Sequence, residues 1–303
     1  MSPPRVSVVI PAYNRAATIE AAVRSVLDQS FADFEAIVVD DGSTDGTLRM
    51  LDAIEDPRLR ILCQETNRGV SAARNLGISA ARAPWVAFQD SDDLWRADKL
   101  ARQMARLEFY EREAVAFPVA IYCGMEIEER GGSSYVPRRN LSHRDGDVLL
   151  ELVRRSFIST QTLIVRRDIL QDVGGFDEDL RALVDWDLML RVAQRGPVAL
   201  VDEPLVRQRF SDNSITHDPL RRVEARRHLV AKHADLIDRF PGAMAEHHYQ
   251  LSGGFRRCGD LERAARHMSE ARRRAPWKPR WWLAALWLRA LRLTRRRPRG
   301  PAG

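Results

Sequence analysis

The sequence predicts an α/β fold, in which a mostly parallel sheet is flanked by helices and followed by a C-terminal helical extension. Up to residue 88, short β-branched runs alternate with helical segments, a pattern typical of parallel sheets covered on both faces. After Asp218 the pattern is helical up to an end rich in Arg, Pro and Gly. With 303 residues, 45% of them hydrophobic, the chain can bury a large core, and disorder is excluded as its main state.

Four strands are expected before residue 90. Val6 to Ile10 is a β-branched run closed by Pro11, as expected for a strand buried on both faces. The other strands are expected at 36–39, 59–62 and 85–88. Apolar residues at helical spacing predict helices at 16–27, 48–54 and 70–81. Ser43 or Thr44 is expected to cap the second of these helices.

From about residue 114 the expected elements are less regular. We expect strands at 116–123, 162–165 and 197–210, and helices at 148–153 and 183–194. Glycine turns are expected at 131–134 and 174–177.

The C-terminal third is expected to be helical throughout. Residues 243–276 resemble one tetratricopeptide-type helix pair. A single copy cannot build a stacked array, so packing on the rest of the protein is its expected role. We therefore expect a domain at 1–215, a helical extension at 216–276 and a basic amphipathic tail at 277–303.

Charge is distributed unevenly along the chain. The net charge is +6, but residues 255–303 carry 15 Arg or Lys and 3 acids, which leaves −6 for the first 254 residues. The usual partners of such a basic tail are nucleic acid and an anionic membrane surface.

The segment 277–297 is amphipathic. Leu283 and Trp287 share one side of a helical wheel, and Arg289 and Arg292 share the other. Such a helix can lie in a membrane interface, with its arginines attracted to anionic lipid. Packing on the protein with a solvated basic end is an equally good interpretation. Nucleic-acid binding is not expected, because no recognition fold accompanies the charge.

The cysteines and the apolar runs predict the compartment. The three cysteines are far apart, so neither a disulfide framework nor a Cys-based zinc site is expected, and a reducing setting fits best. No signal-peptide pattern begins the chain. The longest uncharged apolar run, Trp281 to Leu288, is far shorter than the roughly 20 residues that span a bilayer. We expect a cytoplasmic protein that could lie peripherally on the cytosolic face of the cell membrane.

Polar residues collect where three of the expected strands end. Tyr13 follows the first strand, Asp41 the second, and residues 90–93 (Asp-Ser-Asp-Asp) the fourth. Ligands bind beyond the carboxyl ends of parallel strands, so these loops predict one site. The clustered carboxylates would repel one another unless a cation lies among them, and Mg²⁺ or Mn²⁺ with a diphosphate would suit them. The alternative is a solvated acidic turn that caps a helix.

Other phosphate-binding motifs are absent from the sequence. No Gly-x-Gly-x-x-Gly follows a strand, and no Gly-x-x-x-x-Gly-Lys-Ser/Thr occurs, which excludes dehydrogenase-type dinucleotide sites and P-loops. Asp40 and Asp41 are adjacent and follow the second strand. Aspartyl phosphatases need two acids separated by one residue after the first strand, so they are a poor match.

Six blocks of the sequence, in order, resemble the inverting glycosyltransferase family 2. They are VSVVIPAYN (6–14), VVDDGSTD (38–45), NRGVSAARN (67–75), FQDSDDLW (88–95), GGFDE (174–178) and VDWDL (184–188). The resemblance implies a glycosyltransferase A-type catalytic domain at 1–215 that binds a nucleotide diphosphate sugar.

The resemblance also implies which residues bind the donor. Pro11 and Tyr13 would border the base, with the Tyr13 ring stacked on it. Asp41 would accept a hydrogen bond from the base or the ribose, and Arg74 would lie near the diphosphate.

Metal and base positions follow from the same resemblance. Asp90 and Asp92 match the family's Asp-x-Asp pair, with Asp92 as the direct ligand of Mn²⁺ or Mg²⁺, while the adjacent Asp93 has no clear role. Asp185 falls where the family has its catalytic base, which would deprotonate the acceptor hydroxyl as it attacks C1. A plain acid in the first turn of a helix is the alternative for Asp185. Asp187 points to another face of the helix and is the poorer candidate.

The expected activity is metal-dependent, inverting transfer of a sugar to a hydroxyl of a glycan, lipid-linked or cell-envelope polysaccharide acceptor. The alternative is a non-catalytic nucleotide-sugar-binding or membrane-tethering scaffold, against which the complete set of aspartates argues. His217 could reach the metal or a phosphate from its loop, although a surface histidine is the simpler interpretation. The sugar and the base are not identified, because their contacts would come from loops between about 114 and 160.

Overall fold

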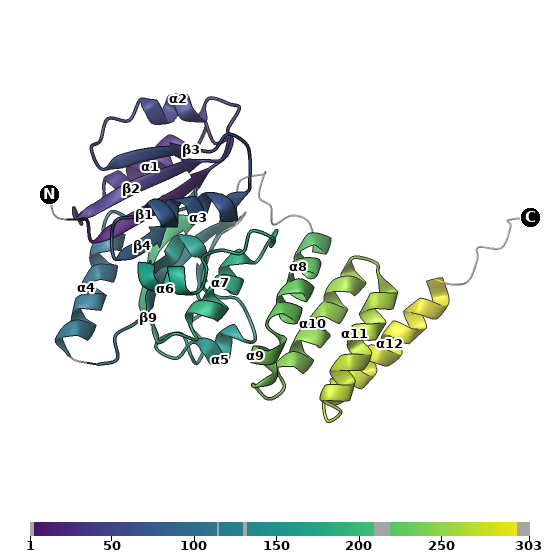
Figure 1. Ribbon diagram of the computed structural model, residues 1–303. Coiled ribbons are helices and arrows are strands. Elements are labelled where there is room, and N and C mark those ends of the chain that lie inside the picture. The colour runs from purple at the N-terminus through teal and green to yellow at the C-terminus, as the bar shows by residue number, and fades with distance from the viewer. Residues whose placement is uncertain (1–2, 114, 130–131, 209–218, 296–303) are drawn as a thin grey trace, which may run out of the picture. The chain divides into compact units, whose positions relative to one another are not determined.

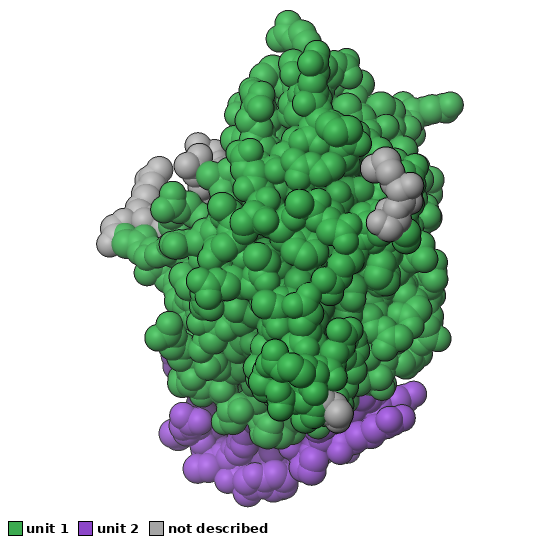
Figure 2. All heavy atoms as spheres, turned by 90° about the vertical axis from the view of Figure 1, so that its left-hand side faces the viewer, with its two compact units in different colours: residues 1–179, 184–214 green, residues 180–183, 215–303 purple. Residues whose placement is uncertain are grey.

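The computed structural model describes residues 3–113, 115–129, 132–208 and 219–295. The chain forms two compact units: unit 1 contains residues 1–179 and 184–214, and unit 2 contains residues 180–183 and 215–303 (Figure 2). The domain boundary expected at residue 215 falls outside the described part of the chain and stays a prediction.

The first half of the unit 1 sheet is parallel. Its order is β3-β2-β1-β4, formed by β1 (Val6–Ala12), β2 (Phe34–Asp40), β3 (Leu59–Cys63) and β4 (Trp85–Phe88). Every residue of β1, β2 and β4 is buried, which explains their nearly continuous apolar sequences. Helices α1 (Ile19–Leu27) and α3 (Val70–Ala80) contact β1 and β2, and α2 (Thr47–Asp52) packs on α1 (Figure 1). Helix α4 (Lys99–Arg112) contacts strands of the second half of the sheet.

The three strands β1, β2 and β4 end at one edge of the sheet. Ala12 pairs with Asp40, and Val9 pairs with Phe88, so the chain leaves all three strands on the same side. We call the loops 13–18, 41–46 and 89–93 the carboxyl edge. Parallel sheets bind ligands at this position, so the fold brings the predicted site residues of these loops to one place.

The second half of the sheet is mixed. The order continues β8-β6-β9-β5, with β5 (Leu94–Trp95), β6 (Ala120–Glu129), β8 (Leu163–Arg166) and β9 (Val198–Gln208), and β7 (Gly132–Val136) pairs with β6. β8 runs antiparallel to β4 and β6, whereas β6 and β9 are parallel. A 3-10 turn (Thr160–Thr162) and the helices α5 (Leu149–Leu152), α6 (Arg167–Asp172) and α7 (Val184–Val192) complete the unit.

The predicted fold class is confirmed, with several local differences. The turn expected at 131–134 is wrong for residues 132–134, which belong to β7, because backbone pairing with β6 overrides the turn preference of Gly and Ser. Neither Ser43 nor Thr44 caps α2: Gly46 precedes that helix, and Asp45 accepts the Thr47 N–H at 2.9 Å. Helix α4 is not among the predicted elements, although its buried Leu100, Met104 and Leu107 have helical spacing. Its many charged residues and its position directly after an acidic turn hide that pattern.

Unit 2 consists, in its described part, of the helices α8 (Pro219–Lys232), α9 (Ala234–Asp238), α10 (Ala243–Arg257), α11 (Leu261–Arg274) and α12 (Pro279–Arg295). The predicted helix pair is α10 and α11, and the Asp260 carboxylate accepts the Arg263 N–H at the start of α11. A second core, which includes Phe255, Trp281 and Leu288, joins α10, α11 and α12.

Helix α12 has both a buried and an exposed apolar side. Trp281 and Leu288 are 3% and 2% exposed, whereas Leu283 and Leu286 are 67% and 64% exposed. The helix therefore packs on its own unit and still presents apolar surface. None of the described helices has the length and apolar composition that a membrane crossing requires.

Candidate active site

Hydrogen bonds connect the loop after β1 to the loop after β2. The Asn14 N–H donates to Ser43 Oγ at 2.9 Å, and the Thr44 N–H donates to Asn14 Oδ1 at 2.8 Å. Asn14 has φ = 51°, a conformation that Asn tolerates better than most residues. The fastening fixes the position of the neighbouring Tyr13, which is 41% exposed at the carboxyl edge, while Pro11 is buried in β1.

Asp41 connects β2 to the start of α3. Its carboxylate accepts hydrogen bonds from Gln64 Nε2 (3.0 Å), the Arg68 N–H (2.7 Å) and the Gly69 N–H (2.8 Å). Asp41 is 2% exposed, so these donors compensate a carboxylate that is largely removed from water. Its predicted contact with a base or ribose stays a prediction.

Arg74, on α3, forms an ion pair with Asp90 of the carboxyl edge. Arg74 Nη2 lies 2.6 Å from Asp90 Oδ1, and the Arg74 side chain is 6% exposed against 29% for Asp90. The guanidinium also lies over the Phe176 ring, 5.2 Å from its centroid. Arg74 Nε is buried without a hydrogen-bond partner among the described residues. A strongly held arginine with an unused donor therefore lies beside a partly exposed carboxylate.

The next two acids have different environments. Asp92 Oδ2 is 4.0 Å from Arg15 Nη2, and both side chains are partly exposed. Asp93 is 1% exposed and accepts a 2.9 Å hydrogen bond from Gln161 Nε2 in the 3-10 turn. Asp93 therefore fastens the acidic turn to the middle of the sheet and is poorly placed to bind a ligand.

The structure corrects the expectation that only a bound cation can make this cluster tolerable. Each of the four carboxylates has a partner within the protein, and for Asp90 and Asp92 that partner is an arginine. Repulsion among the acids is thus no evidence for a metal.

The chemistry of the donor set nevertheless fits a divalent cation. Asp90 and Asp92 are partly exposed oxygen donors one residue apart, and Mg²⁺ commonly takes one or two carboxylates together with phosphate oxygens. Among the described residues, no group of three or more His, Cys, Asp and Glu side chains is arranged to hold a metal ion by itself. His217 lies outside the described residues.

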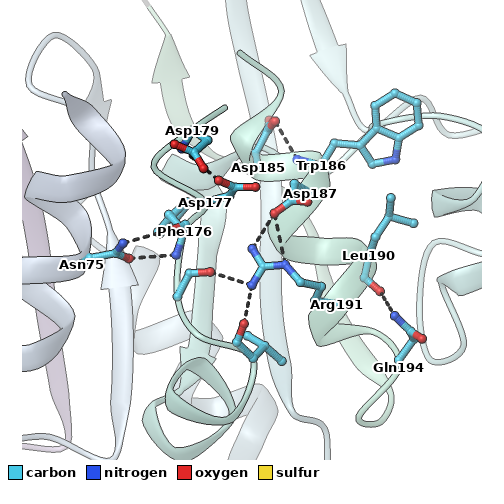
Figure 3. A network of polar contacts seen from close by, with 12 residues as sticks. Asn75, Phe176, Asp177, Asp179, Asp185, Trp186, Asp187, Leu190, Arg191 and Gln194 are labelled. Atoms are coloured by element: carbon cyan, nitrogen blue, oxygen red, sulfur yellow. Dashed lines mark hydrogen bonds and ion pairs between the residues drawn. The ribbon is translucent and has the colours of Figure 1, made fainter. Parts of the chain in front are cut away.

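Asp185 lies in the first turn of α7, and its Oδ1 accepts the Trp186 N–H at 2.8 Å (Figure 3). Burial raises the pKa of the Asp185 carboxyl above its ordinary value, the Trp186 N–H and the Arg74 charge oppose this rise, and the Asp90 charge adds to it. Asp185 therefore interacts electrostatically with the Arg74–Asp90 pair. A carboxylate with a raised pKa is suited to take up a proton.

Asp187 has a structural role. It is 0% exposed and lies 2.5 Å from Arg191 Nη2, one turn along α7. Arg191 Nη1 donates to the carbonyl oxygens of Val173 and Gly175 at 2.6 and 2.7 Å (Figure 3). This ion pair fastens α7 to the glycine turn that precedes it.

Asn75 is a site residue that the sequence analysis missed. It exchanges two 2.8 Å hydrogen bonds with the backbone of Phe176 (Figure 3). Its Nδ2 also donates to Glu178 at 3.0 Å. Gly175 allows this approach, because it has φ = 66° and a Cβ there would lie 2.5 Å from Asn75 Oδ1. Asn75 and Gly175 both belong to quoted motifs, but nothing in the sequence indicates that these motifs touch.

A family model described as "Glycosyl transferase family 2" matches residues 7–174. Among curated relatives, "Putative teichuronic acid biosynthesis glycosyltransferase TuaG" of Bacillus subtilis is 33% identical over 217 residues, covering 70% of this chain and 82% of the relative. An "Uncharacterized glycosyltransferase" of Rickettsia felis is 32% identical over 213 residues, 70% of this chain but only 34% of the relative, so the chain spans about a third of that protein. "UDP-Glc:alpha-D-GlcNAc-diphosphoundecaprenol beta-1,3-glucosyltransferase WfgD" of Escherichia coli is 39% identical over 102 residues, 34% of this chain and 40% of the relative.

Two solved structures have the same fold. The S. aureus TarS 1–349 structure in complex with UDP-GlcNAc has a TM-score of 0.68 and 21% identity, with 90% of this chain and 82% of that chain covered. The mannosyltransferase PcManGT from Pyrobaculum calidifontis, in complex with GDP-Man and Mn²⁺, has a TM-score of 0.61 and 22% identity, with 97% and 87% covered.

Proposed function

This chain belongs to glycosyl transferase family 2, and we propose that it transfers a sugar from a nucleotide diphosphate sugar to a hydroxyl group of a cell-envelope glycan or a lipid-linked acceptor, with inversion at C1. The observation that carries this proposal is the arrangement of Asp185 with the Arg74–Asp90 pair at the carboxyl edge. The names of TuaG and WfgD, which refer to teichuronic acid biosynthesis and to a diphosphoundecaprenol-linked substrate, support the choice of acceptor.

Asp185 acts as the general base in this proposal. Its carboxylate takes the proton of the acceptor hydroxyl while the hydroxyl oxygen bonds to C1 of the sugar and the bond from C1 to the diphosphate oxygen breaks. Positioned proton transfer of this kind contributes roughly 10²–10⁴-fold to a rate. Burial supports the role, because the raised pKa of Asp185 makes the carboxylate a better proton acceptor.

Arg74, Asp90 and Asp92 serve the leaving group. The Arg74 guanidinium binds the diphosphate through the donors that Asp90 does not use. Asp90 and Asp92 would hold Mn²⁺ or Mg²⁺, and PcManGT, which was solved with GDP-Man and Mn²⁺, supports this assignment. When bound, the ion would neutralise the charge that develops on the departing diphosphate.

In this proposal the nucleotide base of the donor lies against the loop after β1. Tyr13 offers an exposed ring for stacking beside the buried Pro11, and Asp41 at the end of β2 can accept a further hydrogen bond. Hydrogen bonds hold both loops in place, so this part of the site is formed before the donor binds.

Substitution of Asp185 tests the function directly. We expect Asp185→Asn to lower transfer by about 10²–10⁴-fold, because the amide cannot accept the proton, while donor affinity changes little. Asp172→Asn, which removes an exposed carboxylate at the end of α6, is the control and should keep the wild-type rate. Nucleotide release with donor and acceptor, together with donor titration, measures both quantities. An unchanged transfer rate in Asp185→Asn would contradict the assignment of Asp185 as the general base.

We further propose that the protein acts at the cytosolic face of the cell membrane, with α12 lying on anionic lipid. The support is the exposed apolar side of α12 beside its arginines. Truncation is a poor test, since α12 supplies Trp281 and Leu288 to the core. The double variant Leu283→Gln/Leu286→Gln should instead weaken sedimentation with phosphatidylglycerol vesicles by at least about tenfold. Leu220→Gln/Phe109→Gln, two exposed apolar residues elsewhere, should sediment as the wild type does, and equal sedimentation of both variants would exclude α12 as the contact.

A further inference from the structure

Arg15 is an arginine of the carboxyl edge that has no part in the proposed reaction so far. It lies in the loop after β1, and hydrogen bonds hold its backbone on both sides. The Arg15 N–H donates to Thr47 Oγ1 at 2.8 Å. The Arg15 carbonyl oxygen accepts the Thr18 and Ile19 N–H groups, both at 2.9 Å, where α1 begins. The point from which this side chain extends is therefore fixed.

The guanidinium of Arg15 is held much less firmly than its backbone. Its two contacts within the described part of the chain are both long: Nη1 lies 3.5 Å from the Asn14 carbonyl oxygen, and Nη2 lies 4.0 Å from Asp92 Oδ2. N–H···O hydrogen bonds are usually about 2.7–3.2 Å long. The described residues therefore use few of the N–H donors that a guanidinium offers.

Arg58 shows that exposure does not explain these long contacts. The side chains of Arg15 and Arg58 are 28% and 31% exposed. Arg58 nevertheless donates to Asp56 through Nε at 3.0 Å and through Nη2 at 2.8 Å. It also donates to the Leu27 carbonyl oxygen at 2.8 Å. At the same exposure, then, Arg58 is a structural arginine with its contacts made, whereas Arg15 can still donate to a ligand.

The surroundings of Arg15 indicate which ligand this is. Arg15 contacts Asp92, and Arg74 contacts Asp90, so each acid of the proposed metal pair has an arginine beside it. The Arg15–Asp92 pair is partly exposed and long, and such pairs contribute little to stability. The guanidinium can therefore leave Asp92 at a small cost in free energy when an anionic ligand binds nearby.

We propose that Arg15 binds a phosphate group of the sugar donor and exchanges partners when it does so. Without donor, the Arg15 guanidinium compensates the charge of Asp92. With donor, the guanidinium turns to a phosphate oxygen, and the Asp92 carboxylate can then bind the divalent cation. The fixed backbone suits this exchange, because only rotation of the side chain is needed, and guanidinium groups form strong, often bidentate hydrogen bonds with phosphate. The inference rests on the proposed function, since the phosphate is that of the nucleotide diphosphate sugar.

Binding of nucleoside diphosphates to the full-length protein with Mn²⁺ tests the proposal. ADP, CDP, GDP, UDP and dTDP are the probes, and the variants are titrated with the one that the wild type binds most tightly. Arg15→Gln should weaken its binding by at least about tenfold, because a charge-assisted hydrogen bond to phosphate is lost. Arg24→Gln, which removes an exposed arginine that pairs with Glu20 on α1, is the control and should bind as the wild type does.

Mn²⁺ binding without nucleotide separates the role of a ligand from a structural role. Because Arg15 and the cation compete for Asp92, Arg15→Gln should bind Mn²⁺ alone as tightly as the wild type or up to about fivefold more tightly. Electron paramagnetic resonance of the free ion measures this affinity. A variant with a distorted loop would instead lose affinity for both Mn²⁺ and nucleotide.

Three results would overturn the assignment of Arg15. They are unchanged nucleotide affinity in Arg15→Gln, a parallel loss of nucleotide and Mn²⁺ affinity in that variant, and an equal loss of nucleotide affinity in Arg24→Gln. A wild type that binds none of these nucleotides would contradict the proposed function itself, and the inference with it.

Discussion

The two units place arginine side chains in different surroundings. In unit 1, Arg191 lies 2.5 Å from a fully buried carboxylate, that of Asp187, and donates to two backbone carbonyls as well. In unit 2, Arg222 and Arg226 face a cavity whose described lining contains no acid. The first charge is compensated within the protein, whereas Arg222 is exposed to solvent.

The difference indicates which arginines hold structural elements in place and which can bind a ligand. A buried ion pair with all its hydrogen bonds made holds elements in place and has little left to offer a ligand. Arg74 is intermediate, because it pairs with Asp90 while its buried Nε–H has no hydrogen-bond partner in the part of the chain that the structure describes. Compensation within the protein thus distinguishes Arg191, which holds α7 in place, from Arg74, for which we propose a role in ligand binding.

The largest expected effect comes from breaking the complete pair. Arg191→Met should lower the free energy of unfolding of unit 1 by about 3–5 kcal/mol, because the Asp187 carboxylate is left buried without its cation. Arg195→Met, which breaks an exposed pair with Asp172, is the matched control and should cost at most about 1 kcal/mol. Hydrogen exchange in peptides from α7 measures both. Similar protection in the two variants would contradict the distinction between buried and exposed pairs.

Arg74, whose charge is only partly compensated within the protein, should affect the pH dependence of sugar transfer. As the proposed base, Asp185 must be ionised, so transfer should fall about tenfold per pH unit below the pKa of Asp185. Burial raises that pKa above the ordinary value of about 3.9. The Arg74 charge lowers this pKa, so Arg74→Gln should move the acid limb of kcat/KM to higher pH. Arg68→Gln, an exposed arginine near Glu178, should leave the limb in place. A limb unmoved in Arg74→Gln would show that the two side chains do not interact.

The smallest effect tests the open space in unit 2. Gly253→Ala should stabilise α10 by about 0.5–1 kcal/mol, because alanine loses less backbone entropy in a helix and has room there. Gly254→Ala should destabilise the same helix, since the added Cβ meets Val223. Hydrogen exchange of α10 peptides compares the two. Destabilisation by both substitutions would mean that the cavity, which Gly253 lines, is filled in solution by neighbouring side chains.

Much of the carboxyl edge could be predicted from the sequence. The runs that form β1, β2 and β4 are buried on both faces, so they are mostly apolar, and polar loops that begin at Tyr13, Asp41 and Gln89 follow them. The direction shared by parallel strands then brings the following loops together. Local pattern and topology are sufficient for this part.

The remaining contacts could not be predicted, because sequence periodicity reports which side of an element is buried but not what covers it. Asn75 and Phe176 are 101 positions apart, and Asp93 and Gln161 are 68 apart. The cavity in unit 2 likewise requires the relative placement of α8, α10 and α12. The α2 cap failed for a related reason, since Ser43 and Thr44 bind Asn14 on another loop.

The glycine turn before α7 has a consequence for how catalysis responds to substrate. Asn75, which follows Arg74 on α3, forms hydrogen bonds with Phe176 of the turn. Arg191, on the same helix as Asp185, donates a hydrogen bond to the Gly175 carbonyl of the turn. The turn thus connects the neighbour of Arg74, the proposed diphosphate ligand, to the helix of Asp185, the proposed base. In an inverting transfer the hydroxyl attacks C1 on the side opposite the departing diphosphate. A donor that shifts the glycine turn would therefore change the positions of Arg74 and Asp185 together.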